Sequence, residues 1–221
     1  MTELLPLFPL ATVMFPGMPL PLRVFEERYR RMLNDRHLSD PAFGIVLLRS
    51  GRDTDRPATR DLHRVGTAVR IMSRRLRPDG QSDLVVKGTR RFSIETVNWE
   101  LGYGLATVKW HEDQPGDPTA LGFAMRRALA TFDRYVETVT AVTGRDFQGV
   151  RMSDDPVVAS WDLAARLPLH TWERQRLLER DTAAERFADL AYIVRREQRL
   201  LAVSGVLGVA LNHPGHTFTL N

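Results

Sequence analysis

Residues with the chemistry of a catalytic or metal site are few in this chain, and they are scattered. His213 and His216 are close enough to share a metal ion, but two histidines do not complete the ligand set of a zinc site. Glu26 and Glu27 are adjacent carboxylates, whose side chains point apart in a helix, where Arg30 and Arg31 can pair with them. The sequence contains no cysteine, so thiolate nucleophiles, thiolate metal ligands and disulfides are excluded. We therefore expect no catalytic residue, no metal and no cofactor.

The sequence also lacks the motifs of nucleotide-dependent enzymes and of peptidases. Lys87 and Lys109 are the only lysines, and neither lies in a G-x-x-x-x-G-K-[ST] phosphate loop. Gly102-Tyr103-Gly104 lacks the third glycine of a dinucleotide loop and leads into a predicted strand rather than a helix. No G-x-S-x-G nucleophile elbow occurs, and a Ser/Lys pair is improbable with both lysines in the predicted β half. The sequence predicts a protein without enzymatic activity.

Arginine supplies almost all of the positive charge. The chain has 31 basic and 27 acidic residues, a formal net charge of +4. Its densest basic clusters are Arg74, Arg75 and Arg77, and then Arg90 and Arg91. If these five side chains shared one face, they could bind the phosphates of RNA. A modest, scattered excess is more often a set of surface ion pairs, so nucleic-acid binding is the alternative rather than the leading hypothesis.

The first apolar segment, from Leu5 to Leu33, organises the chain around it. Its prolines exclude one continuous helix or a central strand. Phe15-Pro16-Gly17 is typical of a tight turn, and the pattern from Val24 to Leu33 predicts an amphipathic helix of about three turns. The predicted order is strand, turn, strand, short helix. Glu3 and the prolines interrupt the pattern of a signal peptide or membrane span, so we expect a cytoplasmic protein without membrane association.

The following segment, to about residue 113, has the pattern of a β domain. A continuous apolar run at Phe43–Leu48 predicts a strand buried on both faces, and residues 51–61 predict an exposed loop. Strands are also expected at 65–76, 84–97 and 103–110, with a hairpin turn at Pro78-Asp79-Gly80. Gly88 interrupts the 84–97 strand, which indicates a bulge or a barrel corner. Many short strands in succession favour a barrel or sandwich.

A break at residues 112–118 separates this β half from a helical half. Asp117-Pro118 and Asp155-Pro156 have the pattern of helix N-termini, because aspartate caps the helix and proline fits its first position. Thr182 and Glu185 match a capping box. Four helices are predicted, at 118–139, 157–167, 171–179 and 182–201. The residues from about 204 onward are expected to form a tail.

Several motifs in this order resemble the N-terminal domain of Lon protease, the substrate-recognition module of that family. The opening pieces of the resemblance are Leu5–Leu10 (LPLFPL), Phe15–Gly17 (FPG), Pro21–Glu26 (PLRVFE) and Arg28–Arg30 (RYR). It continues through Phe43–Val46, Val65–Ile71, Gly88–Phe92 and Tyr103–Val108, and more loosely at Gln175–Glu179. The order and spacing of the pieces make the resemblance specific.

The resemblance implies an α+β fold. A PUA-like closed β-barrel with a short helix would occupy residues 1–113, a C-terminal α-helical bundle 117–203 and a tail 204–221. It also implies a stand-alone form that lacks the ATPase and peptidase domains of Lon protease. Such a module would bind unfolded or degron-bearing polypeptides, or a partner protein such as a protease or adaptor. PUA-like folds also include RNA binders, which is the second argument for the nucleic-acid alternative.

The polypeptide is expected either in a cleft between the two halves or on the apolar N-terminal surface. An apolar segment rimmed by arginines is the kind of surface that captures exposed hydrophobic segments. The candidate binding residues are Met14, Phe15, Met18, Arg23, Phe25, Arg28 and Tyr29.

Overall fold

The computed structural model describes residues 3–35, 42–49, 61–143 and 152–204. The chain divides into two compact units, Met1–Glu112 and Asp113–Asn221. The division falls at the acidic, proline-containing break between the predicted domains. Most of the predicted loop at 51–61 and the tail with His213 and His216 lie outside the described residues.

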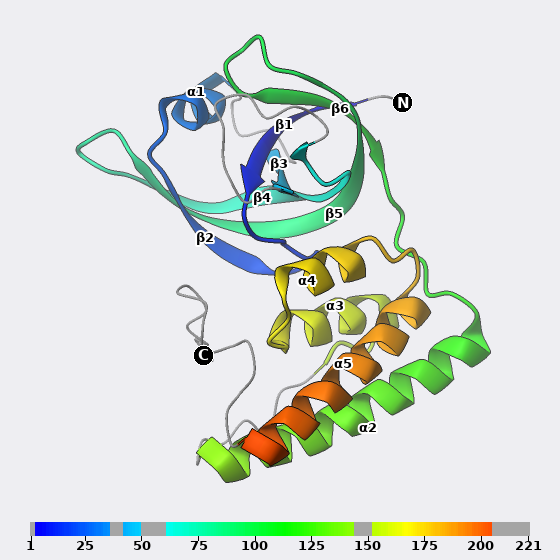
Figure 1. The fold of residues 1–221 in the computed structure, drawn as a ribbon. Helices are drawn as coiled ribbons and strands as arrows, with labels where there is room; N and C mark the ends of the chain where they lie inside the picture. The colour runs from blue at the N-terminus through cyan, green and yellow to red at the C-terminus, as the bar shows by residue number, and fades with distance from the viewer. Residues whose placement is uncertain (1–2, 36–41, 50–60, 144–151, 205–221) are drawn as a thin grey trace. The chain divides into compact units, whose positions relative to one another are not determined.

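Among the described residues, the first unit contains six strands and one helix, and the second contains four helices (Figure 1). The first unit consists of β1 (Glu3–Leu10), β2 (Pro19–Val24), α1 (Glu27–Asp35), β3 (Phe43–Leu47), β4 (Val65–Leu76), β5 (Ser82–Asn98) and β6 (Gly104–Trp110). The second consists of α2 (Pro118–Thr143), α3 (Pro156–Arg166), α4 (Thr171–Leu178) and α5 (Ala183–Ser204). The predicted sequence of strands followed by helices is confirmed.

The strands form one mixed sheet in the order β2-β5-β4-β3-β1-β6. β1 and β3 are parallel, and the other neighbours are antiparallel. The long strand β5 pairs with β2 through its first residues and with β6 through its last, so the ladder β5-β4-β3-β1-β6 returns to β5. The strand β5 therefore belongs to two parts of the sheet, one with β2 and one with β6.

Apolar side chains of the strands and of α1 form the core of this unit. All of β3 is buried, as its continuous apolar run predicts. On α1, Tyr29 stacks on Phe8 of β1 with 4.1 Å between the ring centroids. The helix begins at Glu27 rather than at Val24, which corrects the prediction. Val24 pairs with Ser82 as the last residue of β2, and its buried side chain continues the alternation of that strand.

The Phe15-Pro16-Gly17 turn is fixed to β5 at Gly88. The Gly17 N–H donates to the Gly88 carbonyl at 3.0 Å, and the Gly88 N–H donates to the Met18 carbonyl at 3.0 Å. A Cβ atom at position 88 would collide with the Phe15 carbonyl oxygen, so the close approach requires glycine. Next to Gly88 the register of β5 against β4 shifts by one residue, which confirms the expected bulge.

The helices α2, α3 and α5 of the second unit begin at the predicted caps. Asp117 accepts from the Ala120 N–H at 2.8 Å, and Asp155 accepts from the Val157 N–H at 2.8 Å. Thr182 and Glu185 form the reciprocal capping box, with bonds of 3.0 and 3.2 Å. The bond that the Thr182 N–H donates to the carboxylate is the main cause that lowers the pKa of Glu185. The long helices α2 and α5 pack against each other, and α3 packs against α5.

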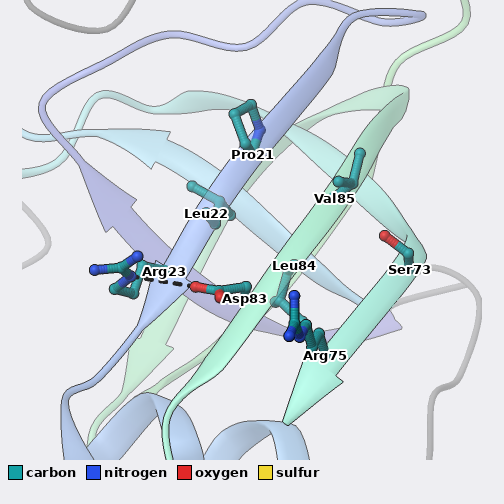
Figure 2. A pocket seen from close by; sticks show the side chains of 8 residues that line it. All are labelled: Pro21, Leu22, Arg23, Ser73, Arg75, Asp83, Leu84 and Val85. Carbon is teal, nitrogen blue, oxygen red and sulfur yellow. Dashed lines mark hydrogen bonds and ion pairs between the residues drawn. The ribbon is translucent and has the colours of Figure 1, made fainter. Parts of the chain in front are cut away.

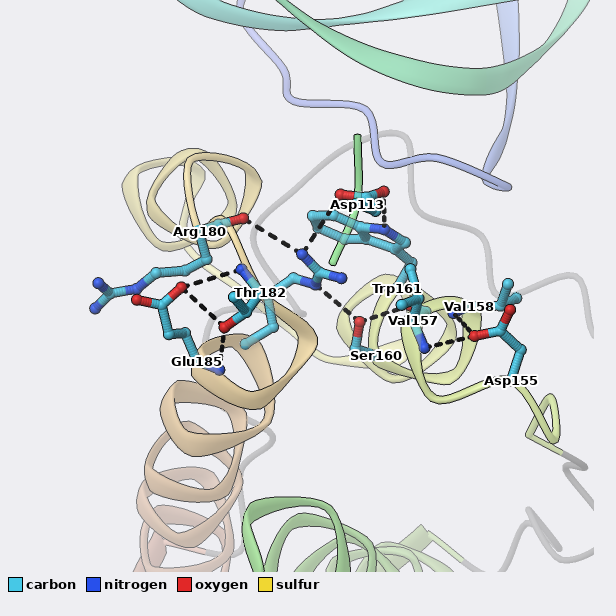
Figure 3. A network of polar contacts seen from close by, with 10 residues as sticks. Asp113, Asp155, Val157, Val158, Ser160, Trp161, Arg180, Thr182 and Glu185 are labelled. Atoms are coloured by element: carbon cyan, nitrogen blue, oxygen red, sulfur yellow. Dashed lines mark hydrogen bonds and ion pairs between the residues drawn. The ribbon is translucent and has the colours of Figure 1, made fainter. Parts of the chain in front are cut away.

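A buried arginine connects α3 and α5 in this unit. The Arg186 side chain is fully buried and donates to Ser160 Oγ at 2.8 Å. Its guanidinium lies 3.9 Å above the Trp161 ring and 3.6 Å from Asp113, which also accepts from the Trp161 indole at 3.0 Å (Figure 3). A buried charge needs such partners to be tolerated, so this group serves the fold.

Candidate functional site

An open groove of about 550 Å³ lies on the first unit, across the neighbouring strands β2, β5 and β4 (Figure 2). It is lined by Pro21, Leu22, Arg23, Ser73, Arg75, Asp83, Leu84 and Val85. Alternate residues of a strand point to opposite sides, and Leu84 and Val86 of β5 point into the core. We call the opposite, solvent-facing side of these three strands the outer face.

Cross-strand pairing arranges the outer face in three rows. Counted along β2, they are the first row at Pro19, the middle row at Pro21 and the last row at Arg23. In the middle row, Val85 of β5 lies between Pro21 of β2 and Ser73 of β4. The Val85 side chain is 39 % exposed although it is apolar. This row gives the groove an apolar floor that no other described side chain covers fully.

The last row is formed by Arg23 of β2, Asp83 of β5 and Arg75 of β4. Asp83 accepts from Arg23 at 3.2 Å and from Arg77 at 2.9 Å. The hydrogen bond from Arg77 has the largest effect in lowering the pKa of this carboxyl, and Arg23 adds to it. Asp83 therefore remains ionised and holds two guanidinium groups, while no ion pair within the described residues involves Arg75.

The first row is formed by Pro19 of β2, Lys87 of β5 and Arg70 of β4. Lys87 and Arg70 are exposed and directly opposite each other. Neither forms an ion pair with any of the residues that the structure describes, so both positive charges face solvent.

A second bulge decides which arginines reach the outer face. The register between β4 and β5 shifts between Ile71 and Ser73, which leaves Met72 as an extra residue on β4. The shift places Ser73 and Arg75 on the outer face, and it turns Arg74 to the other side. There the Arg74 guanidinium donates to Asn34 of α1 at 3.1 Å.

Three of the predicted binding residues are core residues, which corrects that part of the prediction. Met14, Phe15 and Tyr29 are each 1 % exposed or less. Met14 and Tyr29 pack in the cluster between the sheet and α1. The Met14 carbonyl also accepts from Thr67 Oγ1 at 2.6 Å. In this structure these residues hold the N-terminal segment on the sheet and do not reach solvent.

The other four predicted residues have some access to solvent. Arg23 lies on the outer face, and Phe25, directly after β2, is 59 % exposed. Met18 is half-buried beside the turn at Gly88. Arg28 is mostly buried: its guanidinium forms an ion pair of 2.7 Å with Glu26 and lies 4.6 Å from the Tyr29 ring centroid. The seven residues therefore do not form one surface, and only Arg23 lines the groove.

The most informative residues of the outer face, Val85, Lys87 and Asp83, were missed in the sequence. Their signal was present: residues 82 to 87 alternate between buried and more accessible positions, as a half-buried strand does. The sequence did not indicate which strands would lie on each side of β5.

The geometry does not support the arginine-rich RNA face. Arg91 is only 1 % exposed. Arg90 forms an ion pair with Glu3 at 3.5 Å, and its guanidinium lies 3.5 Å from the Trp110 ring centroid. Arg74 points away from the outer face. The two clusters therefore do not combine into one contiguous positive surface.

Metal and membrane signals are also lacking in the described part of the chain. No three His, Asp or Glu side chains there are grouped in a way that could hold a metal ion. Of the helices that the structure covers, none has both the length and the apolar character that crossing a bilayer requires.

Comparison with known proteins gives a consistent result. The family model of the ATP-dependent protease La (LON) substrate-binding domain matches residues 4–196. Lon protease of Escherichia coli K12 is 27 % identical over 200 residues, which are 90 % of this chain and 25 % of that protein. Lon protease of Flavobacterium johnsoniae is 33 % identical over 106 residues, 48 % of this chain and 13 % of that protein. The chain therefore spans about a quarter or less of these relatives, and the match is to the substrate-binding domain rather than to the ATPase or protease domains.

Solved structures agree with this assignment. A Lon N-terminal domain protein from Xanthomonas campestris superimposes with a TM-score of 0.62 and 28 % identity, covering 86 % of this chain and 98 % of that one. The N-terminal domain of Lon protease from the Mycobacterium avium complex has a TM-score of 0.58 at 16 % identity, covering 87 % and 98 %, which supports the fold alone. The chain belongs to the Lon substrate-binding domain family.

Proposed function

We propose that this chain is a non-catalytic polypeptide-binding module that holds unfolded or degron-bearing segments on the outer face of β2, β5 and β4. The observation that carries the proposal is the groove, whose apolar floor of Pro21 and Val85 lies between charged rims. An exposed apolar strip next to charged groups is suited to hydrophobic segments of other proteins. Membership of a substrate-binding domain family supports the same function.

Among the strands that the structure describes, β2 has a neighbour on one side only, and its open edge indicates how a segment would bind. Pro19 and Pro21 have no backbone N–H, so the donors that pair with β5 must come from the alternate residues Leu20, Leu22 and Val24. The open edge of β2 then offers the N–H of Arg23 but lacks two of the donors that strand addition would use. We therefore expect side-chain contacts on the outer face, rather than an added strand, to supply most of the affinity.

Two finer structural expectations belong to the same proposal. The return of the strand ladder to β5 supports a closed barrel of the PUA-like kind in residues 1–113. The packing of α2 with α5 and of α3 with α5 supports a helical bundle over residues 117–203. A partner protease or adaptor is a further candidate ligand for the outer face.

The test is equilibrium binding of a permanently unfolded protein, measured by fluorescence anisotropy. A suitable probe is reduced, carbamidomethylated α-lactalbumin carrying a fluorescent label. Val85→Ser removes the apolar floor at an exposed position, and burial of a side chain of this size corresponds to roughly a fivefold or larger change in Kd. Leu101→Ser is the matched control, because Leu101 is 47 % exposed but lies between β5 and β6, outside the groove.

The proposal predicts saturable binding that Val85→Ser weakens and Leu101→Ser leaves unchanged. No binding by the unaltered chain, or equal loss in both variants, would contradict it.

A further inference from the structure

The positive charges of the outer face flank its apolar row on both sides. In the first row, Lys87 and Arg70 are opposite each other, and the described residues offer them no carboxylate. In the last row, Arg23 and Arg75 flank Asp83, whose charge is already shared between Arg23 and Arg77. Between the first and last rows, the middle row of Pro21, Val85 and Ser73 carries no charge. The face therefore alternates positive, apolar and positive along the strands.

The spacing of these rows matches an extended polypeptide. Neighbouring rows are two residues apart along β5, which corresponds to about 6.7 Å, so the first and last rows are about 13 Å apart. A ligand segment in extended conformation has the same repeat. When one of its side chains lies over Val85, the side chains two residues before and after it lie over the charged rows.

From this match we propose that the outer face selects extended segments in which an apolar residue has a carboxylate two positions before it and another two positions after it. This inference rests on the proposed function and names the class of substrate for the same groove. Lys87 and Arg70 bind one carboxylate, and Arg75 with Arg23 binds the other. Val85 and Pro21 contact the apolar side chain between them.

An acidic peptide fits this pattern better than a nucleic acid does. A nucleic-acid strand carries a phosphate on every nucleotide and would place some of them over the uncharged middle row. It would also need the arginines of the two sequence clusters, and of these only Arg75 lies on the rows themselves. The apolar row and the separated charges favour the acidic–apolar–acidic segment.

The first test compares three labelled peptides that differ only at two positions. Each has a Gly/Ser host with the central sequence X-Ser-Val-Ser-X, where X is Asp, Asn or Lys. Exposed charge pairs contribute little individually, so we expect the Asp peptide to bind roughly three- to tenfold more tightly than the Asn peptide at low salt. The difference should shrink at high salt, and the Lys peptide should bind least.

Lys87→Glu and Lys109→Glu form a matched pair for this test. Both remove an exposed lysine from the same unit, but Lys109 lies on β6, opposite Ser93 and away from the rows. Lys87→Glu should abolish or reverse the preference for Asp over Asn, and Lys109→Glu should preserve it. Equal effects of the two substitutions would overturn the inference.

The location can be measured directly, because the sequence contains only these two lysines. Acetylation of the full chain with a limiting reagent, followed by mass spectrometry, gives the modification rate of each lysine. A saturating Asp peptide should slow acetylation of Lys87 several-fold and leave Lys109 unchanged. Unchanged acetylation of Lys87 under saturation, or stronger protection by a single-stranded RNA oligonucleotide, would overturn the inference.

Failure of this inference is distinguishable from failure of the proposed function. If the Asp and Asn peptides bind equally and Val85→Ser weakens both, the acidic preference is wrong and the polypeptide-binding function stands. If neither these peptides nor the unfolded protein binds, the proposed function fails as well.

Discussion

Arg70 and Lys87 lie directly opposite each other on β4 and β5, with both positive side chains on the solvent-facing side of the sheet. Like charges in this position oppose strand pairing. The pair therefore works against the stability of the unit and at the same time leaves two positive groups for a ligand. This relationship links the folding energetics of the outer face to its proposed function.

Lys87→Glu should consequently stabilise the protein. The substitution replaces repulsion across the strands by attraction, and cross-strand charge pairs contribute roughly 0.2–1 kcal/mol. Urea unfolding of the full chain should show a higher midpoint for the transition of the first unit. Lys109→Glu is the control, and since Ser93 lies opposite it, its free energy of unfolding should change by less than about 0.5 kcal/mol. A lower midpoint for Lys87→Glu would contradict this prediction, because it would mean that Lys87 and Arg70 do not repel each other in the folded protein.

Gly88→Ala should destabilise the first unit. The new methyl group would meet the Phe15 carbonyl oxygen, and overpacking of this kind costs on the order of 1–3 kcal/mol. The comparison is Gly122→Ala in α2, where the added carbon would meet only the flexible end of Arg126 at 3.3 Å. That change should be neutral or stabilise by up to about 1 kcal/mol, since alanine favours helix. Thermal unfolding of both variants tests the pair, and equal shifts would contradict the proposed role of Gly88.

Phe15→Ala and Phe25→Ala should separate a core residue from a surface residue. Phe15 is fully buried, so its truncation should cost roughly 3–5 kcal/mol of unfolding free energy. Phe25 is 59 % exposed, and its truncation should change stability by less than about 0.5 kcal/mol. Denaturant titrations measure both. A small effect at Phe15 would mean that the N-terminal segment is not held on the sheet as described.

The pKa of Asp83 should depend more on Arg77 than on Arg23. Because the folded pKa is below the ordinary value of 3.8, the interaction stabilises the fold above that value. This stabilisation is lost as the pH falls through the folded pKa. Arg77→Ala should raise the pKa of Asp83 toward 3.8 by more than Arg23→Ala does, as measured by carboxyl carbon NMR. A larger rise in Arg23→Ala would reverse the assignment of the main partner.

Local patterns predicted the elements of the fold well. The strand at Val65–Leu76, the turn at Gly80 and the capping box at Thr182 are all present as expected. In these cases the signal and its cause lie within a few neighbouring residues. The resemblance to the Lon N-terminal domain also identified the family correctly, because the order of its motifs spans both halves of the chain.

The binding surface was less predictable because it depends on pairing between distant strands. The extra residue Met72 places Arg75 on the outer face and turns Arg74 away, and nothing local in the arginine cluster indicates that choice. Phe15 and Tyr29 were predicted to belong to an apolar binding surface, but they are buried. Their burial follows from how the N-terminal segment packs on the sheet. Apolar residues of a loop and of a core have the same composition, so only the tertiary structure separates them.

Amide chemical-shift mapping of the isotope-labelled full chain with an unfolded polypeptide tests the central claim most directly. We expect the largest changes at Ser73, Asp83 and Val85, and no comparable change at Leu101 or at Tyr192, which is exposed on α5. Changes concentrated on the outer face would locate the ligand in the groove. Binding that shifts other surfaces and leaves these three amides unmoved would contradict the account.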